Sequence, residues 1–214
     1  MEQLTEPVAI AVGTIVLAIV MVLVIGCCSG DESSNEQQDE AMLEQIQSAL
    51  SLTREEAGRM VHEASSSTPS QIEPRLYLGN AAAAADLGKL RALRINYIVN
   101  ATSNLPNHWE GRGLEYLSVP VEDSLASDLG KYLDTAAIFI ARALSDPYAS
   151  DAVLVHCQQG VSRSATIVLA FLMRERGMSL DAAIAWLHKR RWIRPNEAFH
   201  EQLRAYEAAL VASR

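Results

Sequence analysis

The stretch VLVHCQQGVSRSATIVLAFLM, at residues 153–173, most constrains what this chain can fold into. It begins as an apolar run typical of a strand buried on both faces, becomes polar around Cys157, and resumes as an apolar helix. In α/β proteins, ligands bind beyond the carboxyl ends of the strands. Cys157 directly follows the apolar run at 152–156. The stretch therefore predicts a sheet that carries a cysteine-centred site at its edge.

The residues between this strand and this helix predict an anion-binding loop. A tight loop that ends at a helix N-terminus points successive backbone N–H groups inward, and the helix dipole adds roughly half a positive charge. Gly160 suits close backbone approach or a positive φ, and Arg163 offers a planar fork for two phosphate oxygens. The same positive field stabilises a cysteine thiolate. We expect a Cys157 thiolate that faces a bound phosphate group.

The rest of residues 71–214 alternates between strands and helices. Strand patterns occupy 75–79, 95–101, 114–121 and 152–156, and helical patterns occupy 86–94, 129–144, 164–176, 180–190 and 197–211. Ser179 and Asn196 stand at the N-cap positions of the last two helices. This alternation predicts an α/β fold, a three-layer sandwich with a central, largely parallel sheet flanked by helices.

Residues 1–30 predict a membrane anchor in front of that fold. Val8–Cys28 is almost wholly apolar, and a helix of ~20 apolar residues spans a bilayer. The start MEQLTEP lacks the basic residues of a signal peptide, so we expect an uncleaved transmembrane helix at about 8–28. Neither flank carries Lys or Arg, so the positive-inside rule gives no orientation. We expect a single-pass protein whose domain with Cys157 faces the reducing cytosol, which a thiolate requires.

Cys27 and Cys28, at the end of the apolar run, allow two interpretations. They are either S-acylation sites on the cytosolic side or simply the last residues of the run.

Residues 31–70 read as an acidic spacer that ends in a Ser-rich linker. Residues 1–70 hold eleven acidic side chains and only Arg54 and Arg59, whereas residues 71–214 hold fifteen acidic and sixteen basic ones. The acidity therefore belongs to the front segment, and no basic surface indicates nucleic-acid binding. Apolar residues recur at helical spacing within 41–64. Short amphipathic helices there would dock on the next domain, bind a partner, or space the domain from the membrane.

Cysteine and histidine spacing predicts neither a disulfide framework nor a metal centre. Two of the three cysteines are adjacent, and the five histidines stand at no metal-ligand spacing. We expect no structural metal and no cofactor.

The stretch VHCQQGVSRSATIVLAFLM resembles the signature of the cysteine-dependent (HCx5R) protein phosphatases, specifically their dual-specificity branch. The resemblance extends from about Ile72 to Leu210 and includes IEPRLYLGN, IVNAT, VPVEDS and RWIRPNEAFHEQLRAYE. It implies an α/β sandwich without metal that hydrolyses phosphotyrosine, phosphoserine and phosphothreonine in phosphoproteins through a phosphocysteine. Residues 71–214 are similar in length to the compact members, which share a shallow pocket.

The loop pattern and the resemblance together assign the roles. Cys157 is the expected nucleophile and Arg163 the phosphate clamp. Ser164 is expected to hydrogen-bond the sulfur when the thiolate leaves, and His156 to orient the loop from behind. The backbone N–H groups expected to bind phosphate belong to Gln158, Gln159, Gly160, Val161, Ser162 and Arg163.

The departing oxygen needs a proton, so a general acid is required. Asp123 in VPVEDS is the expected acid because it follows a strand end, on what should be a movable loop. Asp128 is the rival, although its position suggests a cap for the next helix. Asp134 should lie inside that helix, and Glu122 should point away.

Two other functions fit parts of the sequence. A phosphopeptide-binding pseudophosphatase would usually lack the cysteine or the arginine, and both are present. A lipid or inositol phosphatase would suit a membrane anchor, but its polyanionic substrates favour extra cations, and Gln158, Gln159 and Val161 are neutral. The cluster KRRWIR (189–194) either steers phosphorylated substrates or forms a solvated face.

Overall fold

The computed structural model describes Thr53, Glu55, Gly58, His62, residues 66–146 and residues 150–213. Ser66–Arg214 forms a compact unit of its own. The expected membrane span and nearly all of the acidic spacer lie outside the described residues. Among the helices that are described, none combines the length and the apolar character needed to cross a bilayer.

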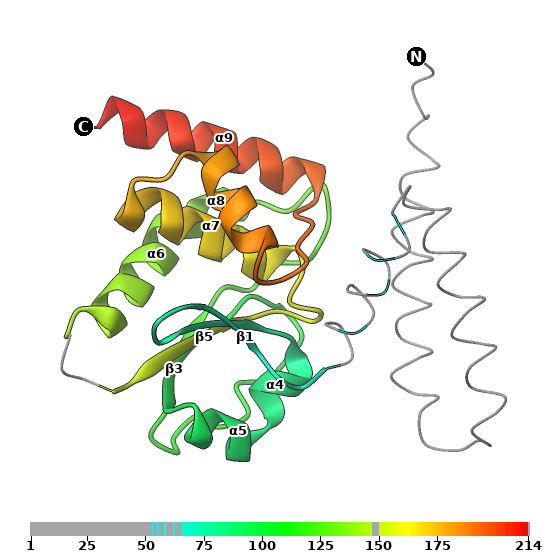
Figure 1. Cartoon of the computed structure of the whole chain (residues 1–214), viewed down its shortest axis with the longest axis vertical. Coiled ribbons are helices and arrows are strands. Elements are labelled where there is room, and N and C mark those ends of the chain that lie inside the picture. The colour runs from blue at the N-terminus through cyan, green and yellow to red at the C-terminus, as the bar shows by residue number, and fades with distance from the viewer. Residues whose placement is uncertain are drawn as a thin grey trace, which may run out of the picture. The chain divides into compact units, whose positions relative to one another are not determined.

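A five-stranded sheet lies at the centre of this unit (Figure 1), in the order β1-β2-β5-β3-β4. The strands β2, β5, β3 and β4 are parallel, and β1 pairs antiparallel with β2. The expected largely parallel sheet is thus a mixed sheet with one antiparallel edge. The strands are β1 (Ser70–Glu73), β2 (Leu76–Gly79), β3 (Ile95–Asn100), β4 (Glu115–Ser118) and β5 (Ala152–His156).

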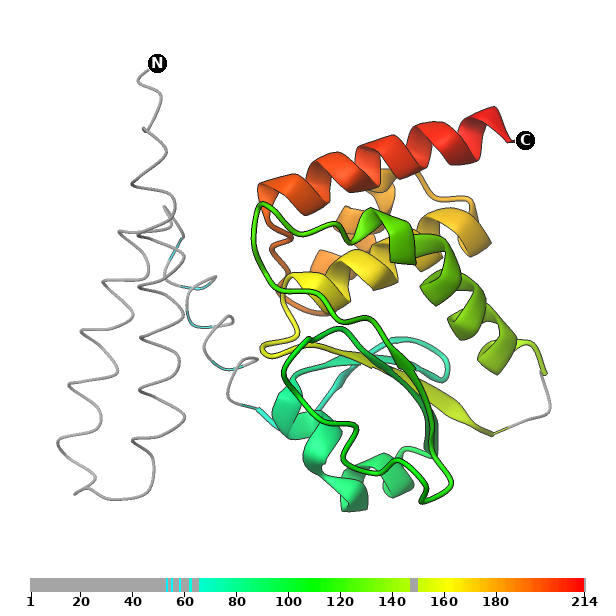
Figure 2. The ribbon, with the colours of Figure 1, turned by 180° about the vertical axis from the view of Figure 1, so that it is seen from behind.

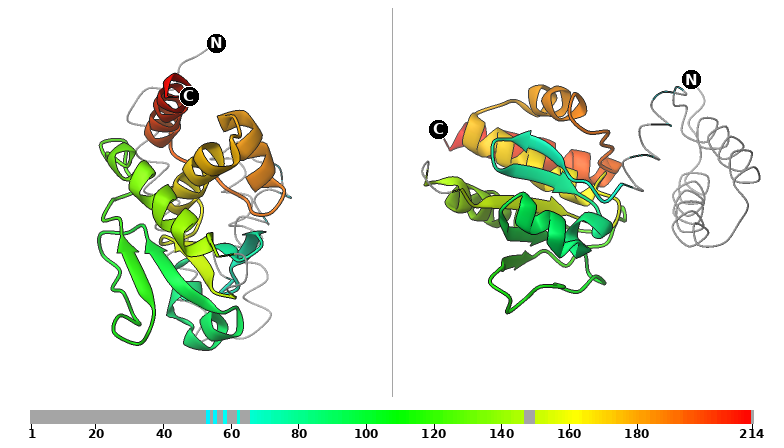
Figure 3. Two further views of the ribbon diagram at one scale, coloured as in Figure 1. Left: turned by 90° about the vertical axis from the view of Figure 1, so that its left-hand side faces the viewer. Right: turned by 60° about the horizontal axis from the view of Figure 1, so that its bottom comes forward.

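Helices cover both faces of the sheet, which confirms the expected α/β architecture of helices around a central sheet (Figures 1 and 2). The short helices α4 (Ala81–Ala85) and α5 (Leu87–Ala92) cover one face. Four helices pack over the other, as the turned views in Figure 3 also show: α6 (Gly130–Leu144), α7 (Arg163–Arg176), α8 (Leu180–His188) and α9 (Glu197–Ala212).

The central strand β5 shows why the sequence favours this arrangement. All five of its residues are buried, because β2 and β3 flank it and helices cover both of its faces. Successive side chains of a strand point to opposite faces. Val153 and Val155 accordingly join the core beneath α6–α9, and Ala152 and Leu154 join the core beneath α4 and α5.

Helix α7, which follows the cysteine loop, is the central helix of its layer. Its residues from Arg163 to Met173 are all buried, in contact with the sheet and with α6, α8 and α9. It ends at Gly177, whose φ of 64° suits a left-handed C-cap and whose N–H donates to the carbonyl of Leu172. A helix packed on all sides gives the loop at its N-terminus a rigid base.

The sequence patterns did not predict β1 and α4. The Ser-rich run 65–70 was interpreted as linker, but Ser70 already pairs in β1, and a domain starting at residue 71 cuts this strand. The β1–β2 hairpin turns at Arg75, which has a φ of 66°. Helix α4 consists of five alanines, so it has no amphipathic pattern, and only the Asn80 side chain marks its start by capping Ala83 N–H.

Two side chains satisfy the first amides of α6. Oδ1 of Asp128 accepts a long hydrogen bond of 3.4 Å from the amide of Lys131, in line with its expected capping role, although the N-cap residue itself is Leu129. In addition, Oε1 of Gln202 in α9 accepts hydrogen bonds from the amides of Leu129 and Gly130, at 2.9 and 2.7 Å. The expected caps Ser179 and Asn196 are confirmed, because their side chains accept from Ala182 and Phe199.

Candidate active site

Cys157 lies at the carboxyl end of β5, where the sequence predicted it, and is 1% exposed. Its Sγ atom accepts two hydrogen bonds, from the N–H of Gly160 at 3.2 Å and from the hydroxyl of Ser164 at 3.2 Å. Both donors stabilise a thiolate more than a thiol. The expected contact between Ser164 and the sulfur is therefore present in the structure.

The carbonyl groups of the loop after Cys157 have partners outside the loop. Those of Gln158 and Val161 accept from the amides of Ala81 and Arg194, and that of Ser162 accepts from Thr166. The Gln159 and Gly160 carbonyls accept from the side chain of Arg191. In a trans peptide, C=O and the following N–H point in opposite directions. This geometry directs the amides of residues 159–163 to the inner side of the loop, a cradle that can bind an anion.

Gly160 is required at its position for two reasons. Its φ of 71° lies in the left-handed region, and an added Cβ would lie 2.4 Å from the carbonyl oxygen of Gly79. Only glycine combines this φ with such close backbone approach at low cost. The sequence-based interpretation of Gly160 is thus confirmed in both respects.

Arg163 begins α7, and its guanidinium makes one hydrogen bond and one ion pair. Nη1 donates to the carbonyl of Val121 at 3.1 Å. Nε is buried without a hydrogen-bond partner among the described residues, and lies 3.6 Å from Oδ2 of Asp123. A buried donor without an acceptor is unfavourable. An oxyanion bound in the loop would supply the missing acceptor.

Asp123 faces the loop from the segment that follows β4. Its Oδ1 accepts from the hydroxyl of Ser162 and from Nδ2 of Asn196, both at 2.9 Å. The rival Asp128 accepts from the amide of Lys131 at the start of α6, and Asp134 lies within α6 and accepts from Tyr206 of α9. Glu122 and Asp123 are both exposed, so the hydrogen bond from Ser162 is what connects Asp123 to the cysteine loop.

His156 is the last residue of β5 and is 2% exposed. Burial lowers its pKa to about 4, against a smaller opposing effect of a hydrogen bond with the Cys157 backbone; His108 and Arg163 lower the pKa further. The imidazole is consequently neutral at physiological pH. Its Nδ1 has no hydrogen-bond partner among the described residues. Its contact with the Cys157 backbone fits the expected position behind the loop.

Sequence reasoning missed two residues that contact this site. Asn196 was expected only to cap α9, and its Oδ1 does accept from the amide of Phe199 at 2.9 Å. Its Nδ2 also donates a hydrogen bond to Asp123. Arg191 was read as part of a steering cluster or a solvated face, but it is 1% exposed. Arg191 is followed in the sequence by the apolar residues Trp192 and Ile193, which are also buried. These two neighbours were the sequence signal that could have indicated a buried arginine.

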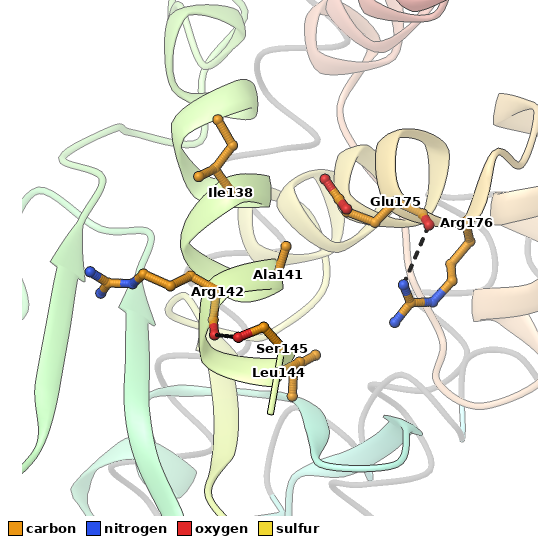
Figure 4. Close-up of a pocket in the computed structure, with 7 residues that line it drawn as sticks. All are labelled: Ile138, Ala141, Arg142, Leu144, Ser145, Glu175 and Arg176. Carbon is orange, nitrogen blue, oxygen red and sulfur yellow. Dashed lines mark hydrogen bonds between the residues drawn. The ribbon is translucent and has the colours of Figure 1, made fainter. Parts of the chain in front are cut away.

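A pocket of about 540 Å³ lies elsewhere on the molecule, between the C-terminal halves of α6 and α7 (Figure 4). Glu175 and Arg176 line it on the α7 side, roughly 18 Å along the helix from Arg163 at 1.5 Å per residue. Its lining includes no residue of the cysteine loop. No group of three acidic, histidine or cysteine side chains that could hold a metal occurs among residues 66–146 and 150–213.

The chain resembles known proteins over most of this unit. The family "dual specificity phosphatase, catalytic domain" matches residues 76–209. The chain belongs to this family. It is 43% identical to human dual specificity protein phosphatase 1 over 145 residues, which cover 67% of this chain but only 38% of that protein. With mouse dual specificity protein phosphatase 26 it shares 43% identity over 144 residues, or 65% of this chain and 67% of that protein.

Solved structures of dual specificity phosphatases share the fold. A mouse putative dual specificity phosphatase complexed with zinc tungstate is 36% identical, with a TM-score of 0.64 over 71% of this chain and 93% of that one. Human DUSP28 is 34% identical, with a TM-score of 0.63 over 68% and 99%. These matches agree with the α/β architecture of Ser66–Arg214.

Proposed function

We propose that this protein is a phosphoprotein phosphatase that hydrolyses phosphotyrosine and phosphoserine or phosphothreonine through a phosphocysteine. The observation that carries the proposal is the convergence of the Cys157 sulfur, the amides of residues 159–163, Arg163 and Asp123 on one loop. The tungstate complex of the mouse relative supports it, because tungstate is a tetrahedral oxyanion like phosphate.

In the first step the Cys157 thiolate attacks phosphorus, and the bond between phosphorus and the substrate oxygen breaks. The inward-facing amides and the Arg163 guanidinium stabilise the charge on the remaining phosphate oxygens. Asp123 in its protonated form gives its proton to the departing oxygen. The products are the dephosphorylated side chain and a phosphocysteine.

In the second step a water molecule attacks the phosphocysteine. The Asp123 carboxylate takes a proton from this water, and the bond between phosphorus and sulfur breaks. The Ser164 hydroxyl, 3.2 Å from the sulfur, stabilises the departing thiolate. Inorganic phosphate is released and Cys157 returns to its starting state, with no metal or cofactor involved.

Turnover of phosphopeptides by the full chain tests this function. Cys157→Ser should abolish turnover but keep tungstate binding, because the loop amides and Arg163 remain. Arg163→Lys should also be severely impaired, because an ammonium cannot replace the planar fork. EDTA should have no effect. Phosphopeptide binding without turnover in the unmodified chain would identify a pseudophosphatase, and a preference for phosphoinositides would identify a lipid phosphatase.

We also propose that Val8–Cys28 anchors the protein in a membrane, with the catalytic domain in the cytosol. The support is the uncharged run from residue 7 to residue 30. A cysteine nucleophile favours the reducing side of the membrane. The phosphoprotein substrates would then be membrane-associated or cytosolic.

A further inference from the structure

One arginine lies behind the phosphate-binding loop, on the side away from the bound anion. We propose that Arg191 is a positioning residue of the reaction: its buried guanidinium fixes the two peptide groups whose N–H groups face the Cys157 sulfur and the phosphate. The proposal deepens the proposed phosphatase function and rests on it. Figure 2 shows the two segments side by side, the yellow loop that begins α7 and the orange connection from α8 to α9.

Each nitrogen of the Arg191 guanidinium donates a hydrogen bond. Nε donates to the carbonyl of Gly160 at 2.8 Å, and Nη2 donates to the carbonyl of Gln159 at 3.2 Å. Nη1 donates to the hydroxyl of Ser70 in β1 at 3.1 Å. The residue as a whole is 1% exposed. Such a side chain has one available orientation, set by the acceptors around it.

The bonded carbonyls determine where two N–H groups point. The carbonyl of Gln159 and the N–H of Gly160 belong to one peptide group, and this N–H donates to the Cys157 sulfur at 3.2 Å. The carbonyl of Gly160 belongs to the same peptide group as the N–H of Val161. Because C=O and N–H are opposed in a trans peptide, holding the carbonyls from behind directs both N–H groups into the cradle.

The charge of Arg191 adds to this geometric effect. Hydrogen bonds from a guanidinium to a carbonyl are charge-assisted and stronger than those between neutral groups. They polarise the peptide group, so its N–H becomes a better donor to an anion on the opposite side. Arg191 thereby strengthens two donors of the cradle, one to the Cys157 sulfur and one to the phosphate, without touching the phosphate.

The loop has little room to adopt another conformation. A Cβ on Gly160 would lie 2.4 Å from the Gly79 carbonyl and 2.8 Å from Nη2 of Arg191. Gly160 is thus enclosed by the end of β2 on one side and by Arg191 on another. A lysine at position 191 has a single nitrogen and cannot reproduce the fork that holds both carbonyls.

The experiment compares Arg191→Lys, Ser70→Ala and the matched control Arg190→Lys in the full chain. Arg190 belongs to the same segment, but its guanidinium stacks on Trp186, 3.6 Å from the ring centroid. Each variant is measured for kcat and KM on a phosphopeptide, for sodium tungstate affinity, for thermal stability, and for the NMR shifts of the Gly160 and Val161 amides.

We expect Arg191→Lys to lower kcat by about 10²-fold, as the loss of oxyanion donors does in other enzymes, with a smaller change in KM. Tungstate affinity should fall as well, and the Gly160 and Val161 amide signals should shift. Ser70→Ala should weaken tungstate binding by about two- to tenfold, the effect of one hydrogen bond. Arg190→Lys should match the unmodified chain in kcat, KM, tungstate affinity and amide shifts. Its thermal stability should fall, because a lysine loses the guanidinium stack on Trp186.

A folded Arg191→Lys variant with unmodified turnover, tungstate affinity and amide shifts would overturn the proposal. If Arg191→Lys does not fold, the Ser70→Ala variant tests the proposal in its place. Unchanged tungstate affinity and unchanged amide shifts in Ser70→Ala would then overturn the proposal. The binding and NMR measurements need no turnover. A chain that hydrolyses nothing, yet loses tungstate affinity in Arg191→Lys, would refute the phosphatase proposal and leave the role of Arg191 in the loop intact.

Discussion

The carboxylate of Asp123 is held against the cysteine loop by side chains from two other segments. Ser162 and Asn196 both donate to its Oδ1, which leaves Oδ2 toward Arg163. If Asp123 protonates the departing oxygen, its importance depends on how much that oxygen needs a proton. The leaving group of the substrate therefore distinguishes a chemical role from a structural one.

Asp123→Ala should lose about 10²–10⁴-fold in kcat on phosphothreonine peptides, whose alkoxide is a poor leaving group. It should lose much less on aryl phosphates with acidic phenols, which depart nearly unaided. The measurement is kcat/KM on both substrates across pH, with Asp128→Ala as the matched control. Equal losses on both substrates, with an unchanged bell-shaped pH profile, would show that Asp123 only supports the loop.

The buried His156 makes the stability of the fold depend on pH. Its pKa is lowered to about 4 in the fold, mainly by burial, from 6.5 in the unfolded chain. Between these values the unfolded chain binds a proton that the fold does not, so stability is lost as pH falls from 6.5 to 4. The loss that His156 contributes should reach about 3 kcal/mol of unfolding free energy.

Urea unfolding of the unmodified chain and of His156→Gln at pH 7.5 and pH 4.5 isolates this contribution. The variant should be less stable at pH 7.5, because the site is packed around an imidazole. The gap between the two proteins should narrow at the lower pH. A gap that stays constant with pH would show that folding does not shift the pKa of His156.

At the scale of elements, one side chain of α9 joins three parts of the structure. Oε1 of Gln202 accepts from the first amides of α6, and Nε2 donates to the carbonyl of Ser127 at 2.9 Å. Gln202→Ala should cost about 1–2 kcal/mol of unfolding free energy, the usual range for a lost helix cap. Glu201→Ala, exposed on the same helix, is the control. Equal stability of the two variants in urea would contradict this role.

Some helices and strands could be predicted from sequence patterns and others could not. β5 and α7 were predicted nearly to the residue, because a strand buried on both faces and a long apolar helix leave clear periodicity. β1 and α4 were not predicted, because a four-residue edge strand beside a Ser-rich run and five alanines carry no period. Hydrogen bonds between distant segments, such as Gln202 to Leu129, leave no local pattern at all.

The residues of the candidate site also fall into those that the sequence predicted and those that it did not. Cys157, Gly160, Arg163 and Ser164 lie within one short stretch, so their spacing alone predicted the loop, and Asp123 followed from its place after a strand. Arg191 reaches the loop only through the fold, and no spacing rule connects it to Gln159, thirty-two positions earlier in the chain. Its burial became visible only when the packing of the α8–α9 connection was known.

At the scale of the whole molecule, the described unit begins at Ser66, and its first residues already make contacts within the fold. Ser70 accepts from Arg191, which holds the cysteine loop, and the carbonyl of Ser66 accepts from Asn80, the N-cap of α4, at 2.9 Å. A fragment of residues 66–214 therefore keeps contacts that a fragment of residues 71–214 lacks. It is the better choice for comparing the catalytic unit with the full chain.

If Val8–Cys28 is a membrane anchor, the full chain should stay in membranes through high-salt and carbonate washes, because a spanning helix is not held by charge. The 66–214 fragment should be soluble and should turn over phosphopeptides at the rate of the full chain. An epitope placed at Arg214 should be digested by protease added outside sealed, cytosol-side-out vesicles. Release of the full chain by carbonate would refute the anchor, and a protected epitope would refute the cytosolic orientation while leaving the anchor in place.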